Sequence, residues 1–194
     1  MWLRCVERFA SREDVTQIIV VIAPEDIDWF RRYYISEINR LLLRIVAGGE
    51  NRVDSIRSGL IAVSPKVGYV AVHDAARPCV TEQEIAAVFN EAKKRGAALL
   101  AAPMVGTIKK VVEGQIEETV PRECFWEAQT PQVFRRELIL EAYQQRIRDV
   151  PTDDAQLVER LGQPVYIVPA DRGNIKITTQ SDLVLAKYLV EKGR

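Results

Sequence analysis

Residues 18–23 of this 194-residue chain are Ile-Ile-Val-Val-Ile-Ala, and this run points to the fold class. A short apolar run rich in β-branched side chains is typical of a strand that is buried on both faces. Pro24 ends the strand, and residues 25–36 can form a helix with the proline near its start. Apolar runs at 41–47, 69–72 and 97–102 predict three more strands with helices between them. This alternation indicates parallel βαβ units with right-handed crossovers.

Helix boundaries are marked by capping residues. Apolar residues from Trp2 onward recur at helical spacing, so the chain opens inside a helix. Thr81 and Glu84 predict a capping box for a helix that ends at Gly96. Thr179 and Asp182 lie in capping positions and predict the start of the last helix. Further elements are expected as helices at 53–60, 135–148 and 152–161 and as strands at 165–168 and 175–177.

Residues 107–120 break this alternation. Apolar residues on both sides of Glu113-Gly114-Gln115 predict a β-hairpin with no helix of its own. An insertion of this kind suggests an arm, here about residues 105–122, and arms often make dimer contacts. We therefore expect one α/β domain over residues 1–194, with a Rossmann-like, doubly wound, mostly parallel sheet and a protruding β-hairpin arm. Its first βα unit is expected to be incomplete, because the chain opens in a helix and contains no GxGxxG or GxxxxGK[ST] loop.

Composition excludes several classes of protein. The 27 basic and 27 acidic side chains balance, which disfavours a DNA- or RNA-binding module. The longest apolar runs are too short to span a bilayer, and the N-terminus lacks the apolar core of a secretory signal. Three cysteines without a CxxC pair, together with a single histidine, argue against a disulfide scaffold and against a zinc site. These features favour a reducing cytoplasm.

Two loops at the expected carboxyl ends of strands could carry chemistry, because ligands of open parallel sheets bind there. Gly48-Gly49-Glu50 precedes a helix N-terminus, which favours anions, but a plain turn that needs positive φ would have the same sequence. Residues 73–78 are His-Asp-Ala-Ala-Arg-Pro. Asp74 could bind a ribose hydroxyl or a metal and Arg77 a phosphate, or the two could simply pair and hold the loop. His73 is interpreted as a core histidine with satisfied hydrogen bonds.

Three later segments are weaker candidates. Thr130 precedes a proline, so it is held extended and its hydroxyl could face a cleft. Trp126 is expected in the core rather than as a platform for a base. Thr152 is expected to open a helix, and the two aspartates that follow it are ordinary residues at a helix start. Lys176 follows a flexible glycine segment and could be a surface residue or a phosphate clamp.

Taken in order, six motifs resemble those of the 2-C-methyl-D-erythritol 4-phosphate cytidylyltransferases. They are GGENRVDSI (48–56), VHDAARP (72–78), ALLAAPMVGTIKK (98–110), TVPRECFWEAQTPQVF (119–134), PTDDAQLVE (151–159) and GNIKITTQSDL (173–183). The resemblance implies transfer of a cytidylyl group from CTP to methylerythritol phosphate with release of pyrophosphate. It also implies Mg²⁺ bound with the triphosphate rather than by a protein metal site, and a homodimer joined through the arms.

The resemblance implies roles for eleven residues. Gly49, Glu50 and Ser55 would contact the cytosine and ribose, with Ala75 close to the ribose. Asp74 would hold the methylerythritol hydroxyls, with Arg77 beside the substrate. Thr130, Thr152 and Lys176 would line the phosphate region, where Lys176 approaches the α-phosphate. Thr107 and Arg122 would reach from the arm into the partner's site and hold the alcohol phosphate there. In such a reaction the attacking phosphate oxygen is already anionic, so charge neutralisation and positioning matter more than a general base.

The sequence departs from the family at its start. The family begins with a strand and a glycine-rich A-A-G-x-G-x-R-M loop, and neither is present here. Met1 is therefore expected to be internal to a longer protein, with the missing strand leaving the sheet open between two neighbours and the chain as written catalytically impaired. Two alternatives remain open: ribitol 5-phosphate as the acceptor, or a non-catalytic homologue that only dimerises.

Overall fold

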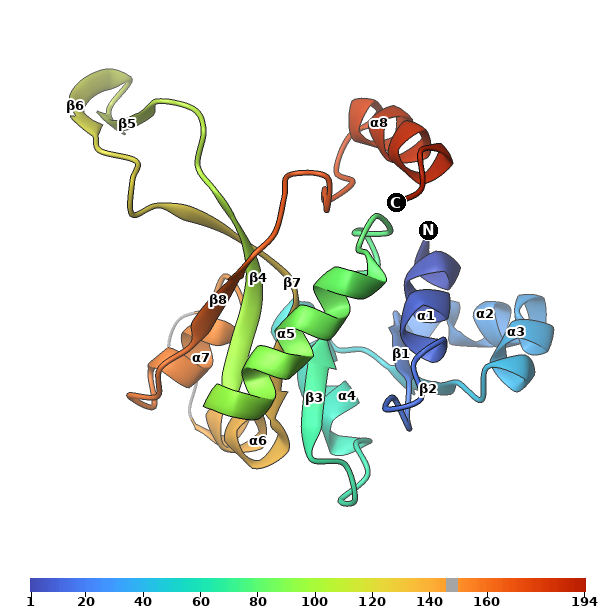
Figure 1. Ribbon diagram of the computed structural model, residues 1–194. Helices are drawn as coiled ribbons and strands as arrows, with labels where there is room; N and C mark the ends of the chain where they lie inside the picture. Colours follow the sequence, from blue (N-terminus) through green and yellow to red (C-terminus); the bar gives the residue numbers. More distant parts are fainter. Residues whose placement is uncertain (146–149) are drawn as a thin grey trace.

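The computed structural model describes residues 1–145 and 150–194, and it is an α/β protein (Figure 1). The helices are α1 (Trp2–Ala10), η1 (Pro24–Asp26), α2 (Ile27–Tyr33), α3 (Ile35–Arg40), α4 (Arg52–Ile61), α5 (Glu82–Arg95), α6 (Arg136–Gln144), α7 (Ala155–Glu159) and α8 (Gln180–Glu191). The strands are β1 (Ile19–Ile22), β2 (Arg44–Ala47), β3 (Tyr69–Val72), β4 (Ala97–Pro103), β5 (Ile108–Val112), β6 (Gln115–Val120), β7 (Trp126–Arg135) and β8 (Tyr166–Pro169). The predicted α/β class is confirmed.

The larger sheet has four strands in the order β3-β7-β4-β8. Strand β8 is parallel to β4, as expected, but β7 runs antiparallel to both β3 and β4. The reason is the arm: the chain leaves β4, forms the β5–β6 hairpin and returns directly as β7, with no crossover helix to restore its direction. Strand β7 was not anticipated, because its sequence carries Thr130-Pro131 in the middle of what becomes a buried strand.

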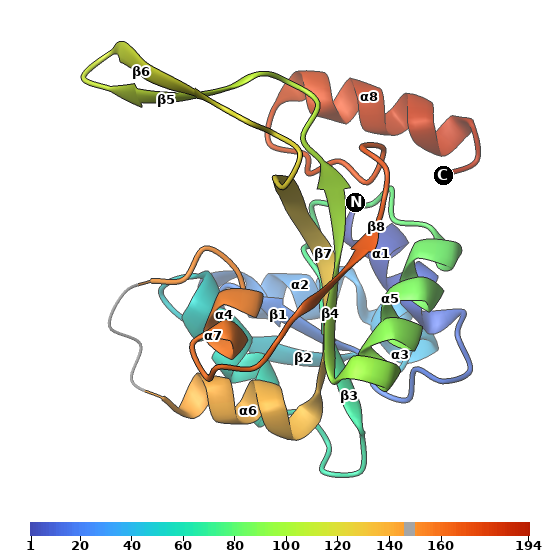
Figure 2. The same ribbon diagram turned by 60° about the vertical axis from the view of Figure 1, so that its left-hand side comes forward.

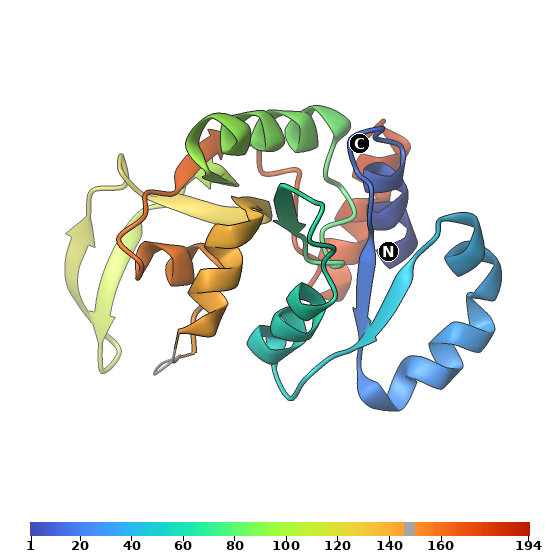
Figure 3. The ribbon, with the colours of Figure 1, turned by 90° about the horizontal axis from the view of Figure 1, so that it is seen from below.

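Strands β1 and β2 form a separate parallel pair. A cavity of about 600 Å³ lies between β1 and β3 and is lined by residues of both strands. Figure 3 shows the β1–β2 pair, in blue, standing apart from the larger sheet. This matches the expected opening of the sheet between two neighbours. It also corrects the expectation that residues 18–23 are fully buried, since every residue of β1 is only half-buried beside the cavity.

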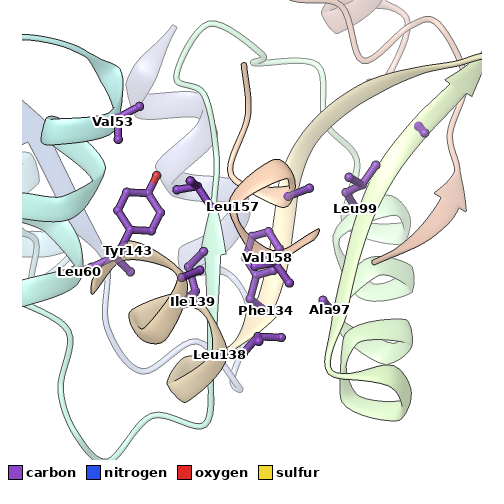
Figure 4. Packing of buried hydrophobic residues seen from close by; sticks show 13 residues of the cluster. Val53, Leu60, Ala97, Leu99, Phe134, Leu138, Ile139, Tyr143, Leu157 and Val158 are labelled. Carbon is purple, nitrogen blue, oxygen red and sulfur yellow. The ribbon is translucent and has the colours of Figure 1, made fainter. Parts of the chain in front are cut away.

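Two apolar clusters cover the faces of the larger sheet. On one face α5 packs against β4 and β7 through Ile85, Val88 and Leu100. On the other face α6 and α7 contribute Ile139 and Val158, which pack with Phe134 of β7 (Figure 4). Figure 3 shows α5 and the α6–α7 pair on opposite sides of the sheet. The predicted capping box at Thr81 is present, and the predicted capping residues Thr179 and Asp182 form a second one at the start of α8. Gly96 ends α5 with positive φ.

The β5–β6 hairpin projects from the body of the molecule (Figure 2). Its strands are mostly exposed, and its apolar side chains Val111, Val112 and Ile116 are more than half exposed. In the described part of the chain, no helix has the length and apolar character needed to cross a membrane.

Several predicted boundaries are wrong. The helix expected at 25–36 is divided into η1, α2 and α3, and the helix expected at 152–161 shortens to Ala155–Glu159. The helix expected at 135–148 begins one residue late because Arg135 still belongs to β7, and its last three residues lie outside the described part. Residues 175–177 do not form a strand; the Ile177 amide donates to the Ala76 carbonyl, and that bond is not continued into a ladder within the described residues. Trp126 is 37% exposed rather than in the core.

Candidate active site

The candidate site lies where β1, β2 and β3 end. Gly48 follows β2 and donates its amide to the carbonyl of Ile22, the last residue of β1. Arg52, the first residue of α4, reaches Asp74, which follows β3 by two residues. The carboxyl ends of all three strands therefore meet at one edge, as ligand sites of open α/β sheets require.

Asp74 is the centre of this edge. One carboxylate oxygen lies 3.2 Å from Arg52 Nε and the other lies 2.8 Å from Lys176 Nζ. The Asp74 amide donates to Thr130 Oγ1 at 3.0 Å, which fixes the backbone of the loop. Burial alone would raise the pKa of Asp74, but the hydrogen bond from Lys176 and the charge of Arg52 outweigh it and lower the pKa below its ordinary value. Asp74 is therefore ionised at neutral pH.

Arg52 also binds a second, deeper carboxylate. Its Nη2 lies 2.8 Å from Asp154 Oδ2, and the Asp154 side chain is 0% exposed. The Tyr143 hydroxyl donates to the other oxygen of Asp154. Burial raises the pKa of Asp154, while Arg52 and Tyr143 oppose that effect. This aspartate is thus a buried anchor for Arg52 rather than an ordinary helix-start acid.

His73 has a structural role. Its Nε2 lies 3.2 Å from the Arg77 carbonyl and its Nδ1 lies 3.2 Å from Thr130 Oγ1. Burial lowers the pKa of His73 to about 4, so the ring is neutral at physiological pH. The interpretation of His73 as a satisfied core histidine is confirmed.

Arg77 braces the loop that carries Lys176. Its side chain is buried, and Nη1 donates to the Asn174 carbonyl at 2.7 Å. Asn174 in turn donates its side-chain amide to the Thr130 carbonyl and to Gln129. The sequence left two roles open for Arg77, binding a phosphate or holding its loop through Asp74. In the structure Arg77 holds a loop, but its partner is the Asn174 carbonyl and not Asp74.

The Gly48-Gly49 pair is required by close packing. A Cβ on Gly49 would lie 2.4 Å from Asp54 Cβ, and one on Gly48 would lie 2.8 Å from Ser55 Oγ. Neither glycine has positive φ, so the expected conformational reason is wrong. The Gly49 amide donates to Ser55 Oγ at 3.1 Å, and Glu50 beside it is exposed.

The other predicted residues are placed as follows. Ala75 is exposed next to Asp74, and Ala75 and Ser55 both line the β1–β3 cavity. Thr130 is buried, with its hydroxyl committed to His73 and Asp74. Thr152 is exposed just before α7. Thr107 and Arg122 flank the arm; Arg122 donates to the Val105 carbonyl, and neither contacts Asp74 within the described residues.

The sequence did not identify four residues that the structure places at the site: Arg52, Asp154, Tyr143 and Asn174. Arg52 lies inside the GGENRVDSI motif, at the expected start of a helix. A cation at that position of the motif was the signal that could have identified it as a site residue. Tyr143 and Asp154 are brought together only by tertiary packing of α6 on α7, which no local pattern reports.

The donor set does not form an all-protein metal cage. Within residues 1–145 and 150–194, no three His, Cys, Asp or Glu side chains gather in a way that could hold an ion. Both oxygens of Asp74 are paired with cations, so Mg²⁺ at this site would have to be held mainly by phosphate oxygens and water.

Comparison with known proteins identifies the family. A sequence model of the 2-C-methyl-D-erythritol 4-phosphate cytidylyltransferases matches residues 1–192. The chain belongs to this family. Its cytidylyltransferase relatives include the protein of Solibacter usitatus, 40% identical over 98% of this chain and 80% of that protein. The protein of Syntrophus aciditrophicus is 43% identical over 92% of this chain and 78% of its own length.

Solved cytidylyltransferase structures share the fold. The structure from Thermus thermophilus superposes with a TM-score of 0.82 at 33% identity and covers 97% of this chain and 89% of that one. The 4-diphosphocytidyl-2C-methyl-D-erythritol synthase from Anaerococcus prevotii gives a TM-score of 0.85 at 29% identity, over 98% and 86% of the two chains.

Proposed function

We propose that this chain transfers a cytidylyl group from CTP to 2-C-methyl-D-erythritol 4-phosphate and releases pyrophosphate. The observation that carries the proposal is the Asp74 carboxylate held between Arg52 and Lys176 at the edge where three strands end. Family membership over residues 1–192 supports the choice of reaction.

The chemistry needs charge control rather than a general base. A phosphate oxygen of the acceptor attacks the α-phosphorus in line, the bond to the pyrophosphate oxygen breaks, and the attacking oxygen carries no proton to remove. Lys176, 44% exposed and beside the site, is assigned to the α-phosphate, where its ammonium group would offset the developing negative charge. Mg²⁺, when bound with the triphosphate, would supply further charge neutralisation.

Asp74 is assigned to the acceptor hydroxyls. Its ionised carboxylate accepts two charged hydrogen bonds in the structure, so it is oriented before a substrate arrives. Arg77 and Thr130 are positioning residues in this scheme, because their polar groups hold the Asn174 and Asp74 backbones. Gly49, Glu50, Ser55 and Ala75 are assigned to the nucleotide, and Thr152 to the phosphate region.

The arm is assigned to a homodimer contact. Its half-exposed apolar side chains, Val111, Val112 and Ile116, are unusual for a free hairpin, and burial between two copies would remove them from water. Thr107 and Arg122 at its base would then reach the partner's site and hold the acceptor phosphate. We assign the protein to the cytoplasm, where its free thiols Cys5, Cys79 and Cys124 stay reduced.

The deciding experiment measures pyrophosphate release by the 194-residue chain with CTP, Mg²⁺ and methylerythritol 4-phosphate. The expected result is release that depends on this acceptor and falls in Lys176→Ala, with Lys187→Ala on the exposed α8 as the matched control. The expectation of weak turnover stays a prediction that the same assay measures.

Two outcomes would contradict the proposal. Faster release with ribitol 5-phosphate would move the assignment to that acceptor. A dimer in sedimentation that neither binds CTP nor releases pyrophosphate would make the chain a non-catalytic homologue.

A further inference from the structure

Strand β7 carries three buried polar side chains, and each of them bonds to a different part of the candidate site. Gln129 accepts a hydrogen bond from the Asn174 side chain. Thr130 accepts one from the Asp74 amide. The third side chain is Gln132, which bonds to the chain at the start of α7.

Gln132 lies in the middle of the larger sheet. It pairs with Val72 of β3 on one side and with Leu99 of β4 on the other, and it is 1% exposed. At such a position an amide side chain loses its hydrogen bonds to water, which costs free energy unless both of its polar atoms have partners in the protein. The partners of Gln132 therefore decide whether a glutamine is stable here.

Both polar atoms of the Gln132 side chain bond to one short segment. Nε2 donates to Asp153 Oδ2 at 2.9 Å, and Oε1 accepts from the Ala155 amide at 2.9 Å. Between these two residues lies Asp154, whose carboxylate is held by Arg52 at 2.8 Å. Three successive residues are thus fixed by side chains that are distant from them in the sequence.

This fixed segment determines where Thr152 lies. Asp153 Oδ1 accepts from the Gln156 amide at 3.0 Å, and the Gln156 side-chain oxygen accepts from the Thr152 amide at 3.0 Å. Thr152 itself is exposed. A displacement of Asp153 is therefore passed to the backbone of Thr152 through two hydrogen bonds.

We infer that Gln132 is a positioning residue, which through Asp153 and Ala155 orders the segment that presents Thr152 to a substrate phosphate. The role of Thr152 rests on the proposed function, whereas the hydrogen bonds of Gln132 do not. Gln132 touches no reacting group in this scheme and acts through the segment alone. Misplacing a substrate-binding group by about 1 Å can cost about a hundredfold in rate.

The two partners require an amide at position 132. The Asp153 carboxylate can only accept and the Ala155 backbone N–H can only donate, so the side chain between them must donate with one atom and accept with the other. Glutamine does both at once. A carboxyl group of the same shape could accept from Ala155, but it would face Asp153 as a second negative charge unless it carried a proton.

Gln132→Glu is therefore the discriminating variant, because it keeps the shape and changes only the donor. In acid one proton lies between the new carboxyl group and Asp153 and restores the contact, and loss of that proton breaks it as the pH rises. The ratio of kcat/KM in Q132E to that in wild type should fall between pH 6 and 8, by up to about tenfold per pH unit. Asp154, Arg52 and Tyr143 adjoin this pair in both proteins, so the wild-type profile is the baseline.

Two measurements on the 194-residue chain follow the change. The first is the NMR protection factor of the Ala155 and Gln156 amides without substrate, which should fall about tenfold or more in Q132E at pH 8 and return toward the wild-type value at pH 6. The second is kcat/KM for pyrophosphate release over the same range, with Tm measured in parallel. A merely structural role would lower Tm without making the activity of the folded protein depend on pH.

Two further variants complete the test. Q132E/D153N exchanges the donor and the acceptor: the amide introduced at position 153 donates to the carboxylate, and its oxygen still accepts from Gln156. Since no shared proton is needed, this variant should recover the protection of Ala155 and most of kcat/KM at every pH. Gln163→Glu, an exposed residue beyond α7, is the matched control and should behave as wild type.

Three results would overturn the inference: wild-type protection in Q132E at every pH, a loss of activity in Q132E that does not vary with pH, or a double variant as impaired as Q132E. The last result would mean that the Asp153 carboxylate itself acts on the substrate. Absence of pyrophosphate release by the wild-type chain would refute the proposed function and with it the role of Thr152. The protection factors would still decide separately whether Gln132 orders the segment.

Discussion

Replacing Arg52 by methionine tests the ion-pair network beneath the site. The substitution keeps much of the side-chain length and removes the cation that lies 2.8 Å from the fully buried Asp154. Removing one partner of a buried ion pair destabilises a protein by about 3–5 kcal/mol. Because the Arg52 side chain is 35% exposed, we expect the lower end, about 3 kcal/mol. For a chain of this size that corresponds to a fall in Tm of about 6–12 °C at pH 7.

The pH dependence gives the sign of the effect. Burial already raises the pKa of Asp154 in the native protein, and loss of Arg52 raises it further. The folded state then binds more protons than the unfolded state between the unfolded pKa of about 3.9 and the raised folded value. In that window the free energy of unfolding of R52M falls by up to about 1.4 kcal/mol per unit as the pH rises. The deficit against wild type therefore shrinks in acid.

Differential scanning calorimetry from pH 4 to 8 measures both effects. The double variant R52M/D154N is the control, since a neutral amide at 154 still offers an oxygen to the Tyr143 hydroxyl and leaves no unpaired charge. It should recover most of the lost stability. If R52M melts with wild type, shows the same deficit at every pH, or is not improved by D154N, the assignment of Asp154 as a buried anion held by Arg52 is wrong.

Three further predictions concern single side chains. Thr81→Ala removes the capping box of α5 and should cost about 1 kcal/mol, seen as a lower Tm with an unchanged far-ultraviolet spectrum; an unchanged Tm would contradict the capping contribution. Lys176→Ala removes a group that lowers the pKa of Asp74, so that pKa should rise in an NMR titration, and the stability gained from the ionised carboxylate above its unfolded pKa should decrease at neutral pH; an unmoved pKa would refute the contact. Arg122→Ala should raise the KM for the acceptor and leave CTP binding nearly intact, whereas equal loss of both would contradict its assignment to the acceptor phosphate.

The sequence predicts the elements whose signals are local. The β-branched run at 18–23, the capping residues Thr81 and Thr179 and the hairpin around Gly114 all appear in the structure. Strand β7 could not be found in this way, because a proline interrupts it and its pairing partners lie tens of residues away. The prediction that β1 is fully buried was wrong for a related reason, because burial depends on neighbouring strands that a local pattern does not contain.

The site was predictable only where its residues lie in local motifs. Asp74 and Lys176 lie in distinct motifs, and the structure joins them at 2.8 Å. Arg52, Tyr143 and Asp154 come from three separate helix boundaries, and only the packing of α4, α6 and α7 makes them one network. Arg52 and Asp154 lie in two separate motifs, but neither motif indicates that the two side chains meet or that Tyr143 joins them.

The antiparallel strand β7 joins the arm to the site through continuous chain. Only residues 121–125 separate β6 from β7, and β7 carries Gln129 and Thr130, which hold Asn174 and the Asp74 amide. The hairpin and the residues that brace the site thus lie on one continuous segment of chain, which the β4–β7 ladder holds along most of its length. The Thr130 hydroxyl on that segment accepts the Asp74 amide, so the backbone of the Asp74 loop and the base of the arm share one rigid support.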